Sequence, residues 1–215
     1  MQARATWQTD DAAGIGGIAP ERLVFLDESA VLTDMARQYG RSPRGQRATA
    51  KVPFGNWKRL SVLSALGIEG VLATMSIEDA TDGAAFAAYL EQVLLPVLRE
   101  RKPDAVLVMD NLRPHKTAEV QAGLDGSGLD GSGLDGSGLD GSGLDGSGFA
   151  YRYLPAYSPD LSPIEPAWAK MKAHLRRIAA RTLETLQQAL APALDSITAQ
   201  DARGFFRHCG YACPN

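Results

Sequence analysis

Two uninterrupted apolar runs, each followed directly by an aspartate, most constrain the fold of this chain. Leu23–Leu26 leads into Asp27, and Ala105–Met109 leads into Asp110. A continuous apolar run of this length is typical of a strand that is covered on both faces. An unpaired carboxylate is costly to desolvate, so its position at the end of such a strand points to a specific role. If the two strands are neighbours in one sheet, the two aspartates face each other where the strands end.

The remaining periodic segments predict an α/β domain with a mixed sheet. Residues 1–20 are polar and glycine-rich without a period, which predicts a flexible lead-in to a domain covering 21–215. After the first strand, we expect a hairpin (60–68 and 71–77) and then a helix that is capped by Thr81 or Asp82 and kinked or broken at Pro96. A strand (105–109), a helix (about 114–122) and a short strand (149–154) follow. Three helices complete the chain (about 163–179, 183–197 and 199–208).

A low-complexity tract interrupts this pattern. The unit Leu-Asp-Gly-Ser-Gly occurs five times without variation between Leu124 and Gly148. Such a composition buries too little apolar surface to offset the entropy of ordering, which favours a flexible loop inserted in the domain. A calcium-binding role is the alternative, but the aspartate spacing matches neither an EF-hand nor a nonapeptide repeat.

The charge distribution favours a polyanionic partner. The net charge of −3 includes five aspartates of the repeat; without them the chain has 22 basic and 20 acidic residues. No acidic residue occurs between Met35 and Gly67, where seven basic residues lie, and a second acid-free basic span follows Glu165. Either span alone could be solvated surface, but the two together favour nucleic acid. The candidate DNA-binding residues are Arg44, Arg47, Lys58, Arg59, His115, Lys116, Lys172 and Arg176.

Several classes of protein do not fit the sequence. No apolar run is long enough to cross a bilayer, and the first residues lack the apolar region of a secretory signal. Two cysteines do not make a disulfide scaffold. We therefore expect a cytoplasmic protein without a membrane partner.

A third carboxylate, Glu165, follows a proline-rich turn that begins at Tyr157. Ser162-Pro163-Ile164-Glu165 satisfies the capping-box template, so by spacing alone Glu165 is better explained as a cap than as a metal ligand. Together with Asp27 and Asp110, however, it would form a cluster of three repelling carboxylates. Mg²⁺ is the natural ion to relieve that repulsion, and a pair of such ions supports phosphoryl transfer.

Three segments resemble the catalytic blocks of DDE transposases: Leu23–Ser29, Val108–Asn111 and Tyr153–Glu165. The pattern is most similar to the bacterial insertion-sequence family numbered 630, which is related to the mariner elements, and the resemblance covers about 21–212. It implies a ribonuclease-H-like fold and a DDE triad of Asp27, Asp110 and Glu165 that binds Mg²⁺ or Mn²⁺. It also implies cleavage and strand transfer of transposon ends into TA sites by a protein that is a homodimer when active.

The sequence departs from that family at four places. Ser162 replaces an asparagine, and we expect its hydroxyl to cap the helix as well; Leu112–Pro114 replaces small residues before His115. The N-terminal helix-turn-helix part of the family has no counterpart, so the sequence resembles the catalytic half alone, as if it were encoded by a second reading frame or truncated. In the first case, a separately encoded helix-turn-helix subunit is the expected partner. One copy of the repeat would give the usual loop length, so the other four are interpreted as a tandem expansion of 20 residues.

Two other functions are consistent with the same residues. The chain could be a catalytically inactive DNA-binding remnant of a transposase, or a ribonuclease-H-like nuclease that acts on other substrates. Cleavage assays distinguish both from a transposase.

Overall fold

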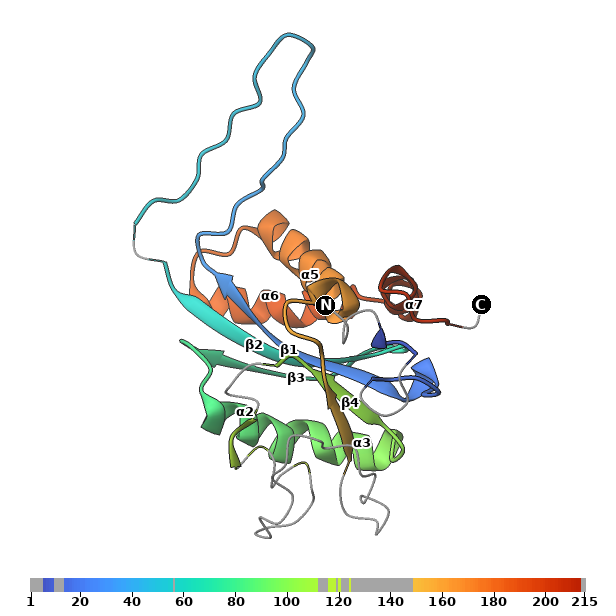
Figure 1. Cartoon of the computed structure of the whole chain (residues 1–215). Coiled ribbons are helices and arrows are strands. Elements are labelled where there is room, and N and C mark those ends of the chain that lie inside the picture. The colour runs from blue at the N-terminus through green and yellow to red at the C-terminus, as the bar shows by residue number, and fades with distance from the viewer. Residues whose placement is uncertain are drawn as a thin grey trace.

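A five-stranded mixed sheet, in the order β3-β2-β1-β4-β5, forms the centre of the protein (Figure 1). The computed structural model describes residues 6–9, 14–55, 57–111, 116–118, 120, 124 and 149–213. β1 pairs antiparallel with β2 and parallel with β4; β2–β3 is an antiparallel hairpin, and β4–β5 is a parallel pair. The predicted α/β class with a mixed sheet is thus confirmed. The strands are β1 (Leu23–Leu32), β2 (Arg59–Gly67), β3 (Gly70–Glu78), β4 (Val106–Met109) and β5 (Ala150–Tyr153).

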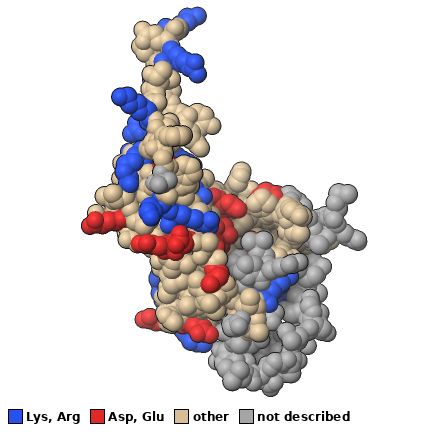
Figure 2. All heavy atoms as spheres, turned by 90° about the vertical axis from the view of Figure 1, so that its left-hand side faces the viewer, with Lys and Arg blue, Asp and Glu red and all other residues tan. Residues whose placement is uncertain are grey.

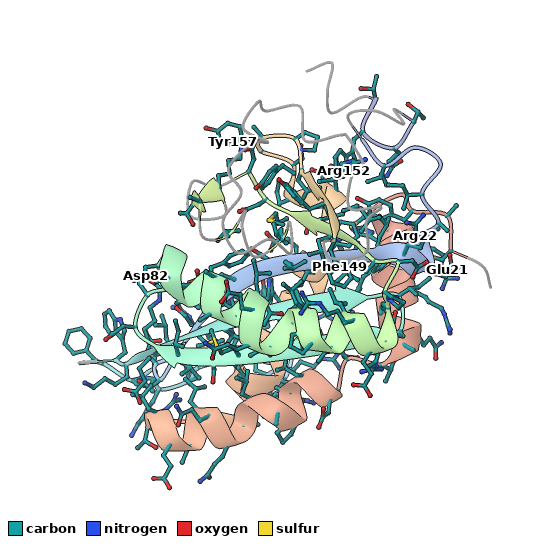
Figure 3. The ribbon with its side chains drawn as sticks, turned by 90° about the horizontal axis from the view of Figure 1, so that it is seen from below. Glu21, Arg22, Asp82, Phe149, Arg152 and Tyr157 are labelled. Atoms are coloured by element: carbon teal, nitrogen blue, oxygen red, sulfur yellow. The ribbon has the colours of Figure 1, made fainter. Side chains whose placement is uncertain are left out.

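Helices cover both faces of this sheet (Figure 1). One face is packed by α2 (Gly83–Tyr89) and α3 (Leu95–Arg101), which are joined by a π-helical turn. Figure 3 shows this layer from below, with Asp82 at its start. The opposite face is packed by α5 (Ile164–Ile178), α6 (Leu183–Asp195) and α7 (Ala199–His208).

The alternation of side chains along β1 assigns Asp27 to one of these faces. Leu23 and Phe25 pack in the core beneath α5, whereas Val24 and Leu26 pack on the α2 side. Because successive side chains of a strand point to opposite faces, Asp27 lies on the α5 side.

β1 is longer than the sequence indicates. The apolar run predicted that the strand ends at Asp27, but β1 continues to Leu32, so Asp27 lies within the strand. The reason is its antiparallel partner: β2 pairs with β1 as far as Leu32, whereas the parallel pairing with β4 ends at Leu26. Asp27 is therefore the first residue of β1 beyond its paired stretch with β4.

The α2–α3 layer matches the predicted helix, including the disturbance at Pro96. Asp82 is the cap, and its Oδ1 accepts a hydrogen bond from the N–H of Ala85 at 2.8 Å. The π-helical turn Leu90–Leu94 lies directly before α3, where Pro96 lacks the N–H that would continue the α-helical bonding.

The described part of residues 1–20 packs against the fold. Trp7 and Ile15 are buried in the core on the α5 side, and the Trp7 Nε1 donates a hydrogen bond to the Tyr211 hydroxyl at 3.1 Å. These contacts tie the start of the described chain to its end, in contrast to the flexible lead-in predicted there. The domain boundary near residue 20 stays a prediction.

Residues 33–58, which we call the arm, connect β1 to β2 and extend away from the sheet (Figure 1). The described arm contains neither helix nor strand, as predicted for this basic span. Its two ends are joined at the sheet, where the Thr33 N–H donates to the Lys58 carbonyl at 3.1 Å and the Lys58 N–H donates to the Thr33 Oγ1 at 2.9 Å.

Two predictions fall mainly outside the described residues: the helix at about 114–122, with His115, and the repeat beyond Leu124. Leu124 itself is fully buried in the core on the α2 side. Among the helices that the structure describes, none is long and apolar enough to cross a membrane.

Candidate active site

The carboxyl group of Asp27 is the most perturbed acidic group of the site. Its pKa is raised from 3.8 to about 7, mainly by burial and to a smaller extent by the negative charges of Glu165 and Asp110. Hydrogen bonds from the Trp168 indole, at 2.9 Å, and from the backbone of Glu28 lower this pKa and offset part of the rise. Glu165 and Asp110 therefore each lie within electrostatic reach of Asp27.

The sheet brings the two aspartates together. β1 and β4 are parallel neighbours, and Leu26 and Met109 are their last paired residues. Asp27 and Asp110 directly follow this pair, one from each strand. Val106 and Val108 of β4 pack on the α5 side, and alternation assigns Asp110 to that side too. The two strands are thus adjacent, which is the condition under which the two aspartates were expected to face each other.

Glu165 enters the site from the first turn of α5. The capping box expected from the sequence is absent there, because Pro163 occupies the cap position and no side chain caps the helix. The Ser162 carbonyl, and not its hydroxyl, accepts the Glu165 N–H at 3.1 Å, so the expectation that the Ser162 hydroxyl caps this helix is wrong. The Glu165 side chain is exposed.

The turn that precedes α5 is fixed by a residue near the end of the described chain. The Tyr211 hydroxyl donates a hydrogen bond to the Leu161 carbonyl at 2.5 Å, and it accepts one from Trp7. Within the turn, Tyr157 has a φ of 57°, a left-handed conformation that non-glycine residues rarely adopt. Its side chain is exposed, as the outer position labelled in Figure 3 illustrates.

The donor set fits a hard divalent cation in its chemistry. Three carboxylates supply only oxygen ligands, the type that Mg²⁺ and Mn²⁺ prefer. A desolvated carboxyl group beside two further negative charges is also an arrangement that a cation would stabilise. Across the described ranges, however, no three His, Cys, Asp or Glu side chains already converge on one point as a metal-ligand cluster.

Two of the predicted DNA-binding residues lie on α5, Lys172 near the carboxylates and Arg176 one turn further along the helix. Glu165, Trp168, Lys172 and Arg176 are spaced by three or four residues, which places them along one side of α5. Burial lowers the pKa of Lys172, as does the nearby Arg176, while Glu165 and Asp27 raise it. A short basic row thus leads along α5 away from the carboxylates.

The other predicted DNA-binding residues are distributed around this row. Arg44 and Arg47 are exposed on the arm, and Figure 2 shows Lys and Arg side chains along the arm and near its base. Lys58 is exposed at the end of the arm, and Arg59 lies 3.3 Å from Glu28 in an ion pair. Lys116 lies over the Tyr153 ring, 4.7 Å from its centroid. His115 lies outside the described residues.

Three residues with contacts at or near the site were not predicted. In the sequence, Trp168 is one member of an apolar helix face. Only its spacing of three residues from Glu165 indicates that it lies on the same side of the helix as that carboxylate. The Arg181 Nη1 donates to the carbonyls of Thr33 and Met35, at 3.0 and 2.9 Å, and so holds the base of the arm. Nothing in the local sequence marks Arg181 or Tyr211 for these contacts.

A protein-family model described as DDE superfamily endonuclease matches residues 22–187, most of the chain and all three carboxylates. The chain belongs to this family. Comparison with curated proteins gives no match.

Solved structures of the Mos1 mariner transposase share the fold of this DDE endonuclease domain. The Mos1 paired-end complex with the left transposon end superposes with a TM-score of 0.63 at 18% identity, over 88% of this chain and 52% of that one. The isolated Mos1 catalytic domain gives a TM-score of 0.56 at 16% identity, over 88% and 76% of the two chains. The chain thus spans about half the length of Mos1 in the complex. The ribonuclease-H-like fold is confirmed.

Proposed function

We propose that this chain is the catalytic domain of a transposase that cleaves DNA at transposon ends and transfers the strand to a target. The observation that carries the proposal is the electrostatic coupling of Asp27 to Glu165 and Asp110, three carboxylates from β1, α5 and the end of β4. Supporting it are the family match and the fold shared with Mos1, whose complexes contain transposon ends and which has been solved with Mn and with Mg.

In the proposed mechanism, Asp27, Asp110 and Glu165 would hold two Mg²⁺ or Mn²⁺ ions. Bound there, these ions would activate the attacking water or 3′-hydroxyl and stabilise the leaving oxygen in an in-line phosphoryl transfer. The protein's own side chains position the reactants. Trp168 fixes the Oδ2 atom of the Asp27 carboxylate, and the ammonium of Lys172 and the guanidinium of Arg176 bind backbone phosphates.

The proposal also covers the type of transposase, its target site, its oligomeric state and its DNA contacts. We assign the chain to the bacterial insertion-sequence family 630, with TA target sites, a homodimeric active form and a cytoplasmic location at the nucleoid. End recognition is assigned to a separately encoded helix-turn-helix subunit. The catalytic domain is proposed to cover 21–215, with 124–148 as an inserted loop. Arg44, Arg47, Lys58, Arg59, His115 and Lys116 are proposed to contact DNA with the basic row of α5.

The test is metal-dependent nicking of supercoiled plasmid DNA in Mg²⁺ or Mn²⁺. We expect Asp27→Asn, Asp110→Asn and Glu165→Gln each to abolish nicking, because each removes a charged ligand. Glu28→Gln is the matched control, since Glu28 is the next residue of β1 and points to the other face. If all three variants nick as well as the unmodified protein, the assignment of the triad is wrong.

Two further outcomes distinguish the alternatives. DNA binding without nicking in either metal would show an inactive remnant. Faster cleavage of an RNA–DNA hybrid than of duplex DNA would show a ribonuclease-H-like nuclease.

A further inference from the structure

A pocket of about 210 Å³ lies at the root of the arm. We propose that it binds a single unstacked base of a DNA strand, an inference that rests on the proposed function because it takes DNA as the partner. Typical pockets for drug-sized ligands are about 300–1,000 Å³, so this one suits a smaller group such as one heterocyclic base. It is lined by Thr33, Asp34, Pro53, Phe54, Gly55, Trp57 and Arg181.

Three separate segments build the pocket. The outgoing end of the arm supplies Thr33 and Asp34, and the returning end supplies Phe54 and Trp57. Arg181, from the connection between α5 and α6, donates hydrogen bonds to the carbonyls of Thr33, Met35 and Ala180. The root of the arm is therefore anchored, although the rest of the arm extends away from the sheet.

The pocket's side chains match the chemistry of a base. Phe54 is fully exposed and Trp57 is 56% exposed, so two aromatic faces are presented to solvent. Aromatic rings stack on unstacked bases of any sequence. The Asp34 carboxylate, which has no hydrogen-bond or ion-pair partner among the described residues, can accept a hydrogen bond from an exocyclic amino group or from the N3–H of thymine.

The surroundings favour DNA over a protein as the occupant. Apart from Asp34, the arm carries no acidic residue, and its basic residues are Arg37, Arg41, Arg44, Arg47, Lys51 and Lys58. This charge is complementary to a phosphate backbone. The basic row of α5 also leads from the carboxylates toward Arg181, so a continuous strand could contact both places.

The length of β1 gives the position of the bound base along that strand. Thr33 follows Asp27 by six positions, which at about 3.3 Å per residue is roughly 20 Å. At the rise of about 3.4 Å per nucleotide of a stacked duplex strand, this distance corresponds to roughly six nucleotides from the reacting phosphate, and an unstacked strand covers it with fewer.

The experiment compares two labelled single strands by fluorescence anisotropy in EDTA: an oligothymidine, and an abasic oligonucleotide of the same length that keeps every phosphate. We expect the double variant Phe54→Ala/Trp57→Ala to bind oligothymidine about 5- to 100-fold more weakly than the unmodified protein. Its affinity for the abasic strand should be unchanged. Tyr39→Ala is the matched control, because Tyr39 is an arm aromatic with 90% exposure that does not line the pocket.

Three outcomes would overturn the proposal. The double variant could lose affinity equally for the abasic strand, Tyr39→Ala could lose as much affinity as the double variant, or oligothymidine binding could stay intact. If oligothymidine binding stays intact, a lower sedimentation coefficient of the double variant than of the unmodified protein would identify a second copy of the chain as the occupant. Because binding is measured without metal, a failure of the nicking assay leaves this test unaffected, and intact nicking with unchanged oligothymidine affinity would reject the pocket alone.

Discussion

The indole nitrogen of Trp168 donates a hydrogen bond to Oδ2 of Asp27, 141 residues earlier in the chain, at 2.9 Å. This bond joins the first turns of α5 to the middle of β1 and thus links two of the three acidic segments of the site. It also lowers the pKa of Asp27 against the opposing effect of burial. Trp168 is therefore a positioning residue for the proposed reaction.

Replacing Trp168 with Phe should shift the pH profile of nicking to higher pH. The variant keeps an aromatic ring in the core but removes the N–H that favours the ionised form of Asp27, so its pKa rises above about 7. Nicking at neutral pH should fall about 10- to 100-fold and recover in part at alkaline pH. Met171→Leu is the control, since Met171 is buried on the same helix without a bond to Asp27. An unshifted profile in Trp168→Phe would leave Trp168 a packing residue only.

Asp27→Asn should stabilise the metal-free protein at alkaline pH. The pKa of Asp27 is about 7 in the folded protein and 3.8 as its ordinary value, so between these values the folded state binds more protons than the unfolded one. The free energy of unfolding therefore decreases as the pH rises from about 4 to 7. Above pH 7, the folded state carries the full cost of burying the ionised Asp27 carboxylate. The amide avoids this cost, which we expect to be worth about 1–3 kcal/mol.

Thermal unfolding in EDTA at several pH values measures this effect. The difference between Asp27→Asn and the unmodified protein should be small near pH 4 and largest near pH 8. Asp195→Asn, at an exposed carboxyl group, is the control and should show no such trend. A difference that does not depend on pH would contradict the buried, proton-binding state of Asp27.

Mg²⁺ or Mn²⁺ should raise the melting temperature more at pH 8 than at pH 6. Ligands bind metal in their deprotonated form, so protons compete with the ion at a carboxyl group whose pKa is about 7. Asp110→Asn and Glu165→Gln should reduce the shift, whereas Glu28→Gln should keep it. An equal shift in all of these proteins would place the bound ion elsewhere.

The sequence predicts the sheet well because its strands are defined by local apolar runs. The hairpin of β2 and β3 follows from two runs joined by a short turn, whereas the pairing of β1 with β4 entered the sequence analysis only as a condition. The end of β1 could not be read in the same way, because β2, a partner 27 or more residues away, extends the strand past Asp27. Strand ends depend on pairing, and pairing is not local.

The site likewise contains residues that local sequence marks and residues whose role depends on distant contacts. Asp27 and Asp110 could be selected from the sequence because each directly follows an apolar run. Glu165 is by spacing alone a capping residue, and only the two aspartates and the family resemblance predict it as the third carboxylate. Trp168, Arg181 and Tyr211 could not be selected, since their contacts reach 141, 148 and 50 residues along the chain. The capping box at Ser162 matches its template, but Pro163 takes the cap position and the template fails.

Tyr211→Phe should impair nicking as well as stability. It leaves the Leu161 carbonyl and the Trp7 N–H without their partner, at a cost of about 1–3 kcal/mol, and it frees the turn that leads to Glu165. Tyr89→Phe is the matched control, because the buried Tyr89 hydroxyl donates to the Ala73 carbonyl at 3.1 Å on the other side of the sheet. Both variants should melt earlier, but only Tyr211→Phe should nick more slowly at a temperature where both remain folded. Equal nicking by the two variants would contradict a role in positioning Glu165.

Deleting residues 129–148, the last four copies of the repeat, should leave the fold intact. The Leu124 carbonyl accepts the Phe149 N–H at 3.0 Å, so the ends of the tract meet, and the four residues that remain between them can close the loop. Shortening this loop sixfold lowers the closure cost by about 1.6 kcal/mol, so the melting temperature should stay the same or rise slightly. Leu124→Ala is the contrast, because Leu124 is fully buried and its truncation should cost about 2–5 kcal/mol. A large loss of thermal stability on deletion would refute the tandem-expansion hypothesis and make the added copies part of the folded structure.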